Sequence, residues 1–234
     1  MTSHGTILGT VGELHRHPVK SLTGERLEQL GIDSRGVVGD RLWAVIDPDG
    51  KLGSGKSSRR FRRMEGLLEV RAEYDADVPV LAFPDGRVLR GDDPAVHGAL
   101  SEHVGRPVTL AREDQVSHFD EGPIHLVATS SLSAIGARHG GDVDVRRLRP
   151  NIVVQSDLSE EQWEGRRVAV GDEVVLQVLY AMPRCVMLDL ATVDLPADGG
   201  LLRTVTDVND GCFGVVADVV TPGTVRVGDR VAMA

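Results

Sequence analysis

The alternation of apolar and polar positions along the chain predicts many short β-strands. Residues 11–14, 42–46 and 67–74 carry apolar side chains at every second position or in short unbroken runs, as strands with a buried face do. Residues 84–86, Pro-Asp-Gly, separate two further runs and are typical of a hairpin turn. Other candidate strands cover residues 80–83, 87–89, 108–110, 124–128, 152–154, 174–179 and 214–220.

Helical patterns are fewer. Asp93 and Pro94 suit the start of a helix over residues 95–104. Thr129-Ser130-Ser131 precedes a second helix over residues 132–138, and residues 159–163 form a short third. Because these helices do not alternate regularly with strands, we expect a mainly β fold of the α+β class, barrel-like rather than a doubly wound sheet, with few short helices.

The chain also shows a small internal repeat and one candidate boundary. Residues 168–174 and 225–231 share the pattern V-x-V-G-D-x-V, which we interpret as two strand–turn–strand corners of one barrel. The polar stretch 111–122 is the best boundary, and it predicts two domains, residues 1–112 and residues 113–234.

Composition and charge then exclude several classes of protein. None of the 234 residues lies in an apolar run near the ~18–20 positions that span a bilayer, and the N-terminus lacks a secretion signal, so we expect no membrane association. The net charge of −9 argues against nucleic-acid binding. Two cysteines, Cys185 and Cys212, are too few for a disulfide framework, so we expect a reducing, cytoplasmic location in which a functional cysteine acts as a thiolate.

Residues 50–57 match the phosphate-binding pattern G-x-x-x-x-G-K-S. The residues that follow, 58–63, lack the apolar face of a packed helix, which disfavours a nucleotide hydrolase. We interpret the segment instead as a basic anion-binding loop, with a solvated surface turn as the alternative. The candidate residues of the loop are Lys56, Ser57, Arg59 and Arg60.

Further candidate residues stand at strand ends. Lys20 and Ser21 follow a predicted strand and either bind an anion or close a turn. His15 and His17 share one strand face, where structural histidines are favoured over a metal site. Asp40 and Arg41, taken alone, are an ordinary surface pair.

The segment Arg146-Arg147-Leu148-Arg149-Pro150-Asn151 precedes a buried strand, and its arginines either face solvent or line an anion pocket. Cys185 follows Arg184 between apolar residues. It is either a small buried side chain or a thiolate assisted by Arg184 and able to bind a soft metal. The segment by itself favours the buried side chain. For Cys212 we expect a packing role.

Five segments, taken together and in this order, resemble the MOSC domain found at the C-terminus of molybdenum cofactor sulfurases. With a MOSC N-terminal β-barrel before it, the arrangement is similar to that of the mitochondrial amidoxime reducing component and its bacterial relatives. The segments are His17-Pro18-Val19-Lys20-Ser21, Gly39-Asp40-Arg41-Leu42-Trp43, Arg147-Leu148-Arg149-Pro150-Asn151, Pro183-Arg184-Cys185 and Pro222-Gly223-Thr224-Val225-Arg226-Val227-Gly228-Asp229.

The resemblance implies a MOSC-type β-barrel packed against a smaller N-terminal β-barrel-like domain. It also implies the molybdenum cofactor, a molybdopterin that carries Mo, with Cys185 as the catalytic residue and metal ligand. The residues implied to contact the cofactor are Lys20, Ser21, Arg41, Ser130, Ser131, Arg147, Arg149, Asn151 and Arg184. One departure concerns residues 53–61, which differ from the T-Q-R-type segment of the reductases and leave the substrate open.

Two functions follow from this resemblance. The first is a molybdenum-dependent oxidoreductase that reduces small N-hydroxylated or N-oxide substrates with electrons from a separate flavin or iron–sulfur protein. The alternative is a sulfur carrier that holds a persulfide on Cys185, received from a pyridoxal-phosphate-dependent desulfurase.

Overall fold

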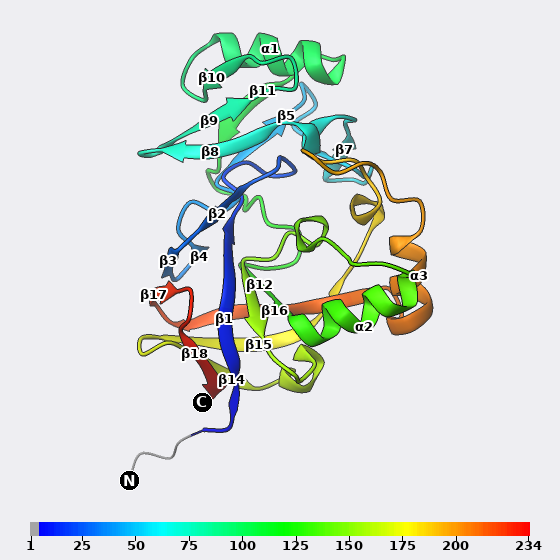
Figure 1. Cartoon of the computed structure of the whole chain (residues 1–234). Helices are drawn as coiled ribbons and strands as arrows, with labels where there is room; N and C mark the ends of the chain where they lie inside the picture. The colour runs from blue at the N-terminus through cyan, green and yellow to red at the C-terminus, as the bar shows by residue number, and fades with distance from the viewer. Residues whose placement is uncertain (1–4) are drawn as a thin grey trace.

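The computed structural model describes residues 5–234, and its largest element is a closed barrel of seven strands. Strand order around the barrel is β13-β12-β16-β15-β14-β18-β1, and pairing of β1 with β13 closes it (Figure 1). The barrel strands are β1 (Ile7–Arg16), β12 (Ile124–Ala128), β13 (Ile152–Gln155), β14 (Arg167–Val170), β15 (Val174–Pro183), β16 (Cys212–Thr221) and β18 (Arg230–Met233). Strand β2 (Glu25–Leu27) extends the sheet beside β1.

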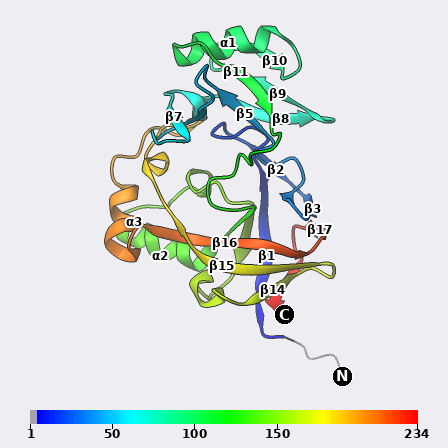
Figure 2. The same ribbon diagram turned by 180° about the vertical axis from the view of Figure 1, so that it is seen from behind.

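Two smaller sheets and one helix form a second unit, residues 43–112, which we call the small unit. One sheet has the order β11-β5-β6-β7 and the other β10-β9-β8. The strands are β5 (Trp43–Ile46), β6 (Leu52–Ser54), β7 (Phe61–Arg63), β8 (Arg71–Asp75), β9 (Val78–Ala82), β10 (Val88–Arg90) and β11 (Thr109–Arg112). Helix α1 (Ala95–Val104) covers the end of this unit that lies away from the barrel (Figures 1 and 2).

The remaining elements pack around the barrel. Strands β3 (Gln29–Asp33), β4 (Gly36–Val37) and β17 (Gly223–Arg226) form a small sheet of their own, while helices α2 (Thr129–His139) and α3 (Leu201–Asn209) pack together beside the barrel (Figure 1). Single-turn 3₁₀ helices cover Leu67–Glu69, Val145–Arg147, Glu160–Trp163 and Val186–Leu188. No helix within residues 5–234 is long and apolar enough to cross a bilayer.

The mainly β fold predicted from the sequence is confirmed. The alternating strands bury their apolar faces mainly in two large cores, one inside the barrel around Leu14 and Trp163, the other inside the small unit around Leu81 and Leu100. Burial of this kind contributes about 25 cal/mol per Å² of apolar surface and dominates the stability of both units. The predicted hairpin at residues 84–86 is the β9–β10 turn.

Two sequence expectations need correction, and one helix was missed. Residues 67–69, expected to begin a strand over residues 67–74, form a 3₁₀ helix that precedes β8. Only one copy of the V-x-V-G-D-x-V repeat joins two barrel strands, β14 and β15; the other joins β17 of the small sheet to β18 of the barrel. Helix α3 was not predicted, because Gly199-Gly200 before it and its threonines and valines are weak helix formers. Packing of the buried Leu201 and Val205 against α2 and its surroundings stabilises it.

The predicted division after residue 112 stays a prediction. The structure adds that β1, near the start of the chain, pairs with β13 and β18 from the second half. The barrel is therefore built from both halves of the sequence.

Candidate functional site

A cavity of about 90 Å³, which we call the main cavity, opens where loops of the barrel meet the small unit and the segment before it. Its lining is strongly basic, and Cys185 stands in its wall. The basic lining residues are Lys20, Arg41, Lys56, Arg147, Arg149 and Arg184, against the acidic Asp120 and Glu121. The excess of positive charge favours an anionic ligand.

Lys20 is the most deeply buried of these cations, with 3% of its surface exposed. It follows β1 where the chain leaves the barrel, and its Nζ donates to Asp120 Oδ1 at 2.5 Å and lies 4.7 Å from the ring centre of Phe61. Asp120 Oδ2 also lies 4.0 Å from Lys56 Nζ, so this carboxylate stands between two lysines. Burial lowers the pKa of Lys20 to about 8, against the opposing attraction of Asp120.

Three residues of the main cavity have left-handed backbone conformations. Ser21, Arg41 and Arg149 have φ angles of 63°, 50° and 54°, and they make up half of the six non-glycine residues with positive φ in the described chain. Such conformations cost about 1–3 kcal/mol each and persist where the surroundings hold them. Backbone strain is thus concentrated at the residues that the resemblance assigned to the cofactor.

Arg41 and Arg149 hold each other in place. Arg41 pairs with the fully buried Asp40 and donates through Nη2 to the carbonyl oxygen of Arg149 at 3.1 Å. Arg149 donates through Nη1 to the carbonyl of Leu22 at 2.6 Å, while its Nη2 is buried and has no hydrogen-bond partner within residues 5–234. The Asp40–Arg41 pair is therefore not the surface pair that its sequence indicated, because Asp40 is fully buried and Arg41 lines the main cavity.

Arg184 lies beside Cys185 at the end of β15. It donates through Nε to the carbonyl of Phe213 at 2.8 Å, through Nη1 to that of Leu148 at 2.9 Å, and through Nη2 to His125 Nε2 at 2.6 Å. All three acceptors are uncharged, so the guanidinium charge is left for other partners. Burial lowers the pKa of Arg184 to about 9, and the nearby Cys185 sulfur opposes this shift.

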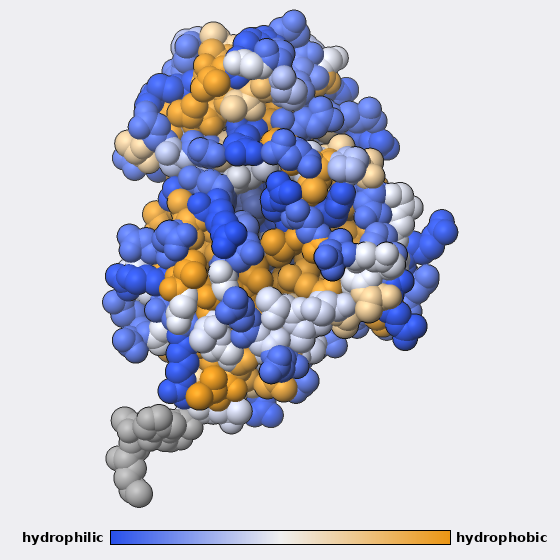
Figure 3. Space-filling model, viewed as in Figure 1, coloured by the Kyte–Doolittle hydropathy of each residue, from blue (hydrophilic) through white to orange (hydrophobic). Residues whose placement is uncertain are grey.

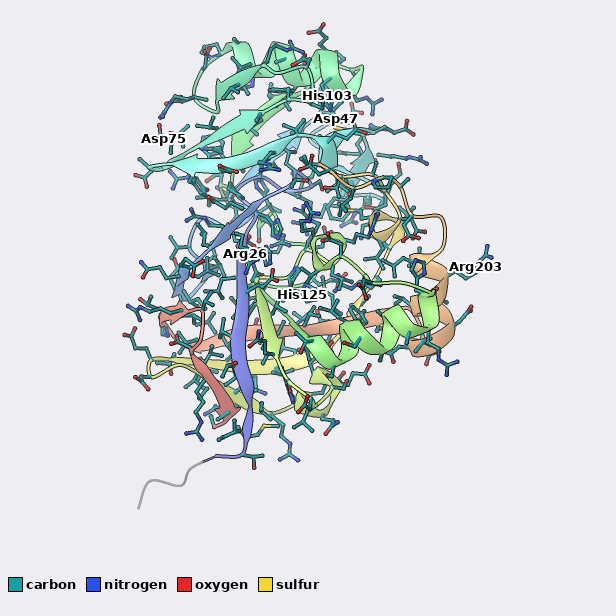
Figure 4. The ribbon with its side chains drawn as sticks, in the orientation of Figure 1. Arg26, Asp47, Asp75, His103, His125 and Arg203 are labelled. Atoms are coloured by element: carbon teal, nitrogen blue, oxygen red, sulfur yellow. The ribbon has the colours of Figure 1, made fainter. Side chains whose placement is uncertain are left out.

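His125 comes from the start of β12 and lies at the centre of the molecule (Figure 4). Burial, followed by the charge of Arg184, holds the pKa of His125 well below its usual value. The ring is therefore neutral at pH 7, and Nε2 accepts the hydrogen bond from Arg184. A neutral acceptor here fixes the arginine without cancelling its charge.

Asn151 and Arg147 position the walls of the main cavity. The amide oxygen of Asn151 accepts from the backbone N–H of His125 at 3.1 Å and its amide nitrogen lies 3.4 Å from the carbonyl of His15, so this side chain connects β12, β1 and the start of β13. Arg147 donates to the carbonyls of Leu190 and Pro196 at 3.2 and 2.6 Å. It anchors the segment that follows Cys185.

The structure does not bring every predicted residue to this cavity. Ser130 and Ser131 lie at the start of α2, where their hydroxyls donate to the carbonyl of Leu158 at 2.9 Å and to Glu160 at 2.5 Å. They line another hollow, beside α3. Their hydroxyls fasten the helix end to residues 158–160, because the helix starts directly at the end of β12.

Of the predicted anion-binding loop, only Lys56 lines the main cavity. Ser57 and Arg59 are exposed, and Arg60 donates to the carbonyls of Ser117 and Phe119. Strands β6 and β7 pair in parallel on either side of this segment, and no helix follows Ser57 before residue 67. A phosphate loop leads into a helix whose N-terminus binds the phosphate, so the structure removes the basis of the nucleotide-hydrolase interpretation.

His15 and His17 have protein partners: Glu13 lies 3.0 Å from His15 Nε2 and the carbonyl of Pro150 lies 3.3 Å from His17 Nε2. Both line a second hollow of about 550 Å³, which shares Arg149 with the main cavity. In the space-filling view the molecule is hollowed between the small unit and the barrel (Figure 3). Among the described residues, no group of three or more His, Cys, Asp or Glu side chains is arranged to hold a metal.

Three of the lining residues that sequence reasoning missed bear on the chemistry of the main cavity. Asp120 lies in the polar stretch that predicted a boundary, His125 lies in an apolar strand, and Met187 follows Cys185 in an apolar run. Only their positions in the folded chain reveal them. No spacing or motif in the sequence marks any of the three.

Models of two protein domains match the chain, and together they cover most of its length. A model of the MOSC domain matches residues 87–232, and a model of the MOSC N-terminal beta barrel domain matches residues 8–92. These matches confirm the resemblance that the five sequence segments indicated.

Several curated proteins and one solved structure are similar to the chain. Mitochondrial amidoxime reducing component 2 of Bos taurus is 25% identical over 96% of this chain and 83% of its own length. Molybdenum cofactor sulfurase of Oryza sativa is 25% identical over 74% of this chain but only 27% of its own length. The YUAD protein of Bacillus subtilis, at 16% identity, has the same fold with a TM-score of 0.52 over 95% of this chain and 93% of its own.

Proposed function

Since the chain belongs to the MOSC domain family, we propose that it holds a molybdenum cofactor in the main cavity and reduces small N-hydroxylated or N-oxide molecules. The similarity to an amidoxime reducing component over 96% of this chain supports this activity. Residues 5–234 contain no helix long and apolar enough to cross a membrane. We also propose a cytoplasmic location for the protein.

The residues of the main cavity fit the chemistry of such a cofactor. A pterin dithiolene with a phosphate is anionic, and here it meets buried cations whose acceptors are mainly neutral groups. The unpartnered Nη2 of Arg149 is a free donor for a phosphate or pterin oxygen. Cys185, the one cysteine among the lining residues, would supply a thiolate ligand to the metal. Because the cavity of about 90 Å³ is smaller than a whole pterin, part of the cofactor has to lie outside it or Asp120 has to move.

The chain's own residues would bind the cofactor, orient it and shield it. Cys185 Sγ would hold the metal, while Lys20, Arg41 and Arg149 would neutralise the anionic part of the cofactor. Asn151 and Arg147 keep the walls in place through their backbone contacts. When bound, the cofactor supplies the two-electron redox chemistry.

The overall reaction also requires a source of electrons and protons. Reduction of an N–OH group to N–H takes two electrons and two protons, breaks the N–O bond and releases one water. We propose a separate flavin or iron–sulfur protein as the electron donor.

The observation that carries the proposal is the half-buried Cys185 thiol in the wall of the cationic main cavity. The test is to purify the protein from a host that makes the cofactor and to measure its metal by mass spectrometry. We expect near-stoichiometric molybdenum, lost in Cys185→Ser and retained in Cys212→Ala, because Cys212 does not line this cavity. Equal molybdenum in both variants would contradict the assignment.

The same thiol also suits the alternative function. The similarity to a molybdenum cofactor sulfurase favours a Cys185 persulfide supplied by a pyridoxal-phosphate-dependent desulfurase. A protein without molybdenum that becomes loaded with a desulfurase-derived persulfide on Cys185 would support the carrier and overturn the reductase.

A further inference from the structure

Another cavity, of about 190 Å³, lies next to the main cavity and is larger than it; we call it the side chamber. Its apolar walls come from Met64, Leu67 and Leu68, which are buried in the small unit, and from the half-buried Leu190 and Ala191 in the segment after Cys185. Its polar side chains are the buried Ser21 and the exposed Arg63, Glu65 and Glu69, so the buried part of the lining is mainly apolar. The chamber therefore suits an apolar group rather than a charged one.

The side chamber and the main cavity share two wall residues, Ser21 and Met187. Met187 comes two positions after Cys185, in the single-turn helix Val186–Leu188. Its sulfur lies 3.8 Å from the Ser54 hydroxyl of β6. A methionine side chain is unbranched and adapts its shape easily, so Met187 is a movable wall between the cation-lined cavity and the apolar chamber.

We propose, on the basis of the function proposed above, that the side chamber binds the apolar part of the substrate and that Met187 limits its size. The polar, reacting end of the substrate then lies in the main cavity on the Cys185 side. An engineered apolar cavity of about 150 Å³ holds one benzene ring. The side chamber, at about 190 Å³, takes a single aromatic ring or a short branched alkyl group and excludes a fused bicyclic group.

A side chain introduced at Gly55 would narrow the side chamber. A Cβ atom at position 55 would lie 2.6 Å from Leu190 Cδ1 and 2.9 Å from Met187 Cγ, both flexible side-chain atoms. Gly55 is not among the glycines with positive φ in the described chain, so alanine fits its backbone. Gly55→Ala therefore displaces Leu190 and Met187 without a forced change of the fold.

The test uses the 234-residue chain with its methionine methyl groups labelled for NMR, and the unreactive probe benzamide. Met64 and Met187 line the chamber, whereas Met233 packs against the barrel core and serves as an internal reference. We expect benzamide to shift the Met64 and Met187 signals and to leave the Met233 signal unchanged. Acetamide, which has no ring, should shift none of them. Benzamide shifts that leave the Met64 signal unchanged would overturn the proposal, because Met187 also borders the main cavity.

Variants then separate the chamber from the reaction. Gly55→Ala should weaken benzamide binding at least about tenfold, while Met187→Ala should admit 2-naphthamide, which the unaltered protein excludes. The matched control is Val186→Ala, because this neighbouring side chain is 39% exposed and lines neither cavity. Unchanged binding in Gly55→Ala would contradict the assignment. Since the probe needs no metal, failure of molybdenum loading and failure of this inference give different results.

Discussion

At the scale of single residues, the main cavity is defined by buried cations that lack full compensation. Burial of a charge is costly unless a partner of opposite charge accompanies it. Among residues 5–234, Asp120 is the one carboxylate paired with Lys20, and Arg149 and Arg184 donate to neutral acceptors. Burial lowers the pKa of both arginines to about 9. An anionic ligand removes this cost, so each of these residues favours binding over the empty cavity.

The pH dependence of anion binding follows from Lys20. Because its pKa is lowered to about 8, the lysine loses its proton as pH rises from 6.5 to 8.5. We expect sulfate, whose own charge is constant in this range, to bind about three- to fourfold more weakly at pH 8.5 than at pH 6.5. Calorimetric titration measures this, and Lys20→Arg should remove most of the dependence. A flat profile in the unaltered protein would contradict the role of Lys20.

Lys20 also makes the free energy of unfolding depend on pH. The unfolded chain keeps the Lys20 proton up to its ordinary pKa of 10.5, while the folded protein without a bound anion loses it near 8. Between these values the unfolded state holds more protons, so the contribution of Lys20 to the free energy of unfolding increases with pH. Urea unfolding of the unaltered protein and of Lys20→Met at pH 7.5 and 9.5 measures it. The gap in stability between the two proteins should shift in favour of the unaltered one at the higher pH.

Asp120 opposes an anionic ligand, because its carboxylate stands between Lys20 and Lys56. Asp120→Asn should therefore tighten sulfate binding about fivefold, which corresponds to on the order of 1 kcal/mol. Asp114→Asn makes the same change of charge at an exposed position outside the cavity and should have little effect. Equal tightening in both variants would show that only net charge matters.

At the scale of elements, the site depends on how closely neighbouring strands approach. In β16, Gly214 has a φ of 76°, and a Cβ there would lie 2.4 Å from His125 Nε2 and 2.8 Å from the carbonyl oxygen of Leu126 in β12. Only glycine allows β12 and β16 to meet at this point. The strand register thus sets the position of His125 and, through it, of Arg184.

Gly214→Ala should consequently lower the free energy of unfolding by about 3 kcal/mol or more, since both the backbone conformation and the contact with Leu126 resist it. Gly140→Ala is the matched control: its φ is 93°, but no atom lies within 4 Å of the added Cβ. Backbone strain alone should cost this control about 1 kcal/mol. Urea unfolding of both variants measures the difference, and equal losses would mean that the strand contact is unimportant.

At the scale of the whole molecule, the two units are joined by more than the chain. Val193 N donates to the carbonyl of Leu68 at 3.2 Å, and the hydroxyl of Thr192 donates to the same carbonyl at 3.1 Å. The segment after Cys185 therefore contacts the small unit directly. Both cavities lie along this junction, so their shape depends on the two units staying together.

We expect the two units to unfold in one transition. The only two tryptophans report on different units: Trp163 lies in the barrel core and Trp43 packs against the core of the small unit. Urea unfolding followed by fluorescence in Trp43→Phe and in Trp163→Phe should give midpoints that agree once corrected for the stability of each variant by circular dichroism. Midpoints separated by more than about 1 M urea would show independent units.

The sequence by itself determined the strand-rich class, because alternation with a period of two reflects which face of each strand is buried. It also carried the residue types of the main cavity, in five segments that together indicate one family. It could not place Ser130 and Ser131, whose hydroxyls the structure turns toward residues 158–160, since a serine at a helix start suits a cap as well as a ligand.

Only the tertiary structure decided which charges meet. Lys20 and Asp120 are separated by 100 positions in the sequence, and Arg41 and Arg149 by 108, yet each pair is joined by a hydrogen bond. The side chamber likewise combines residues 55–69 with residues 187–191. A local sequence pattern reflects the burial of one face of one element. A cavity, by contrast, is formed by side chains from several elements that are distant in the sequence. The shape of the cavity therefore depends on how the barrel closes through β1.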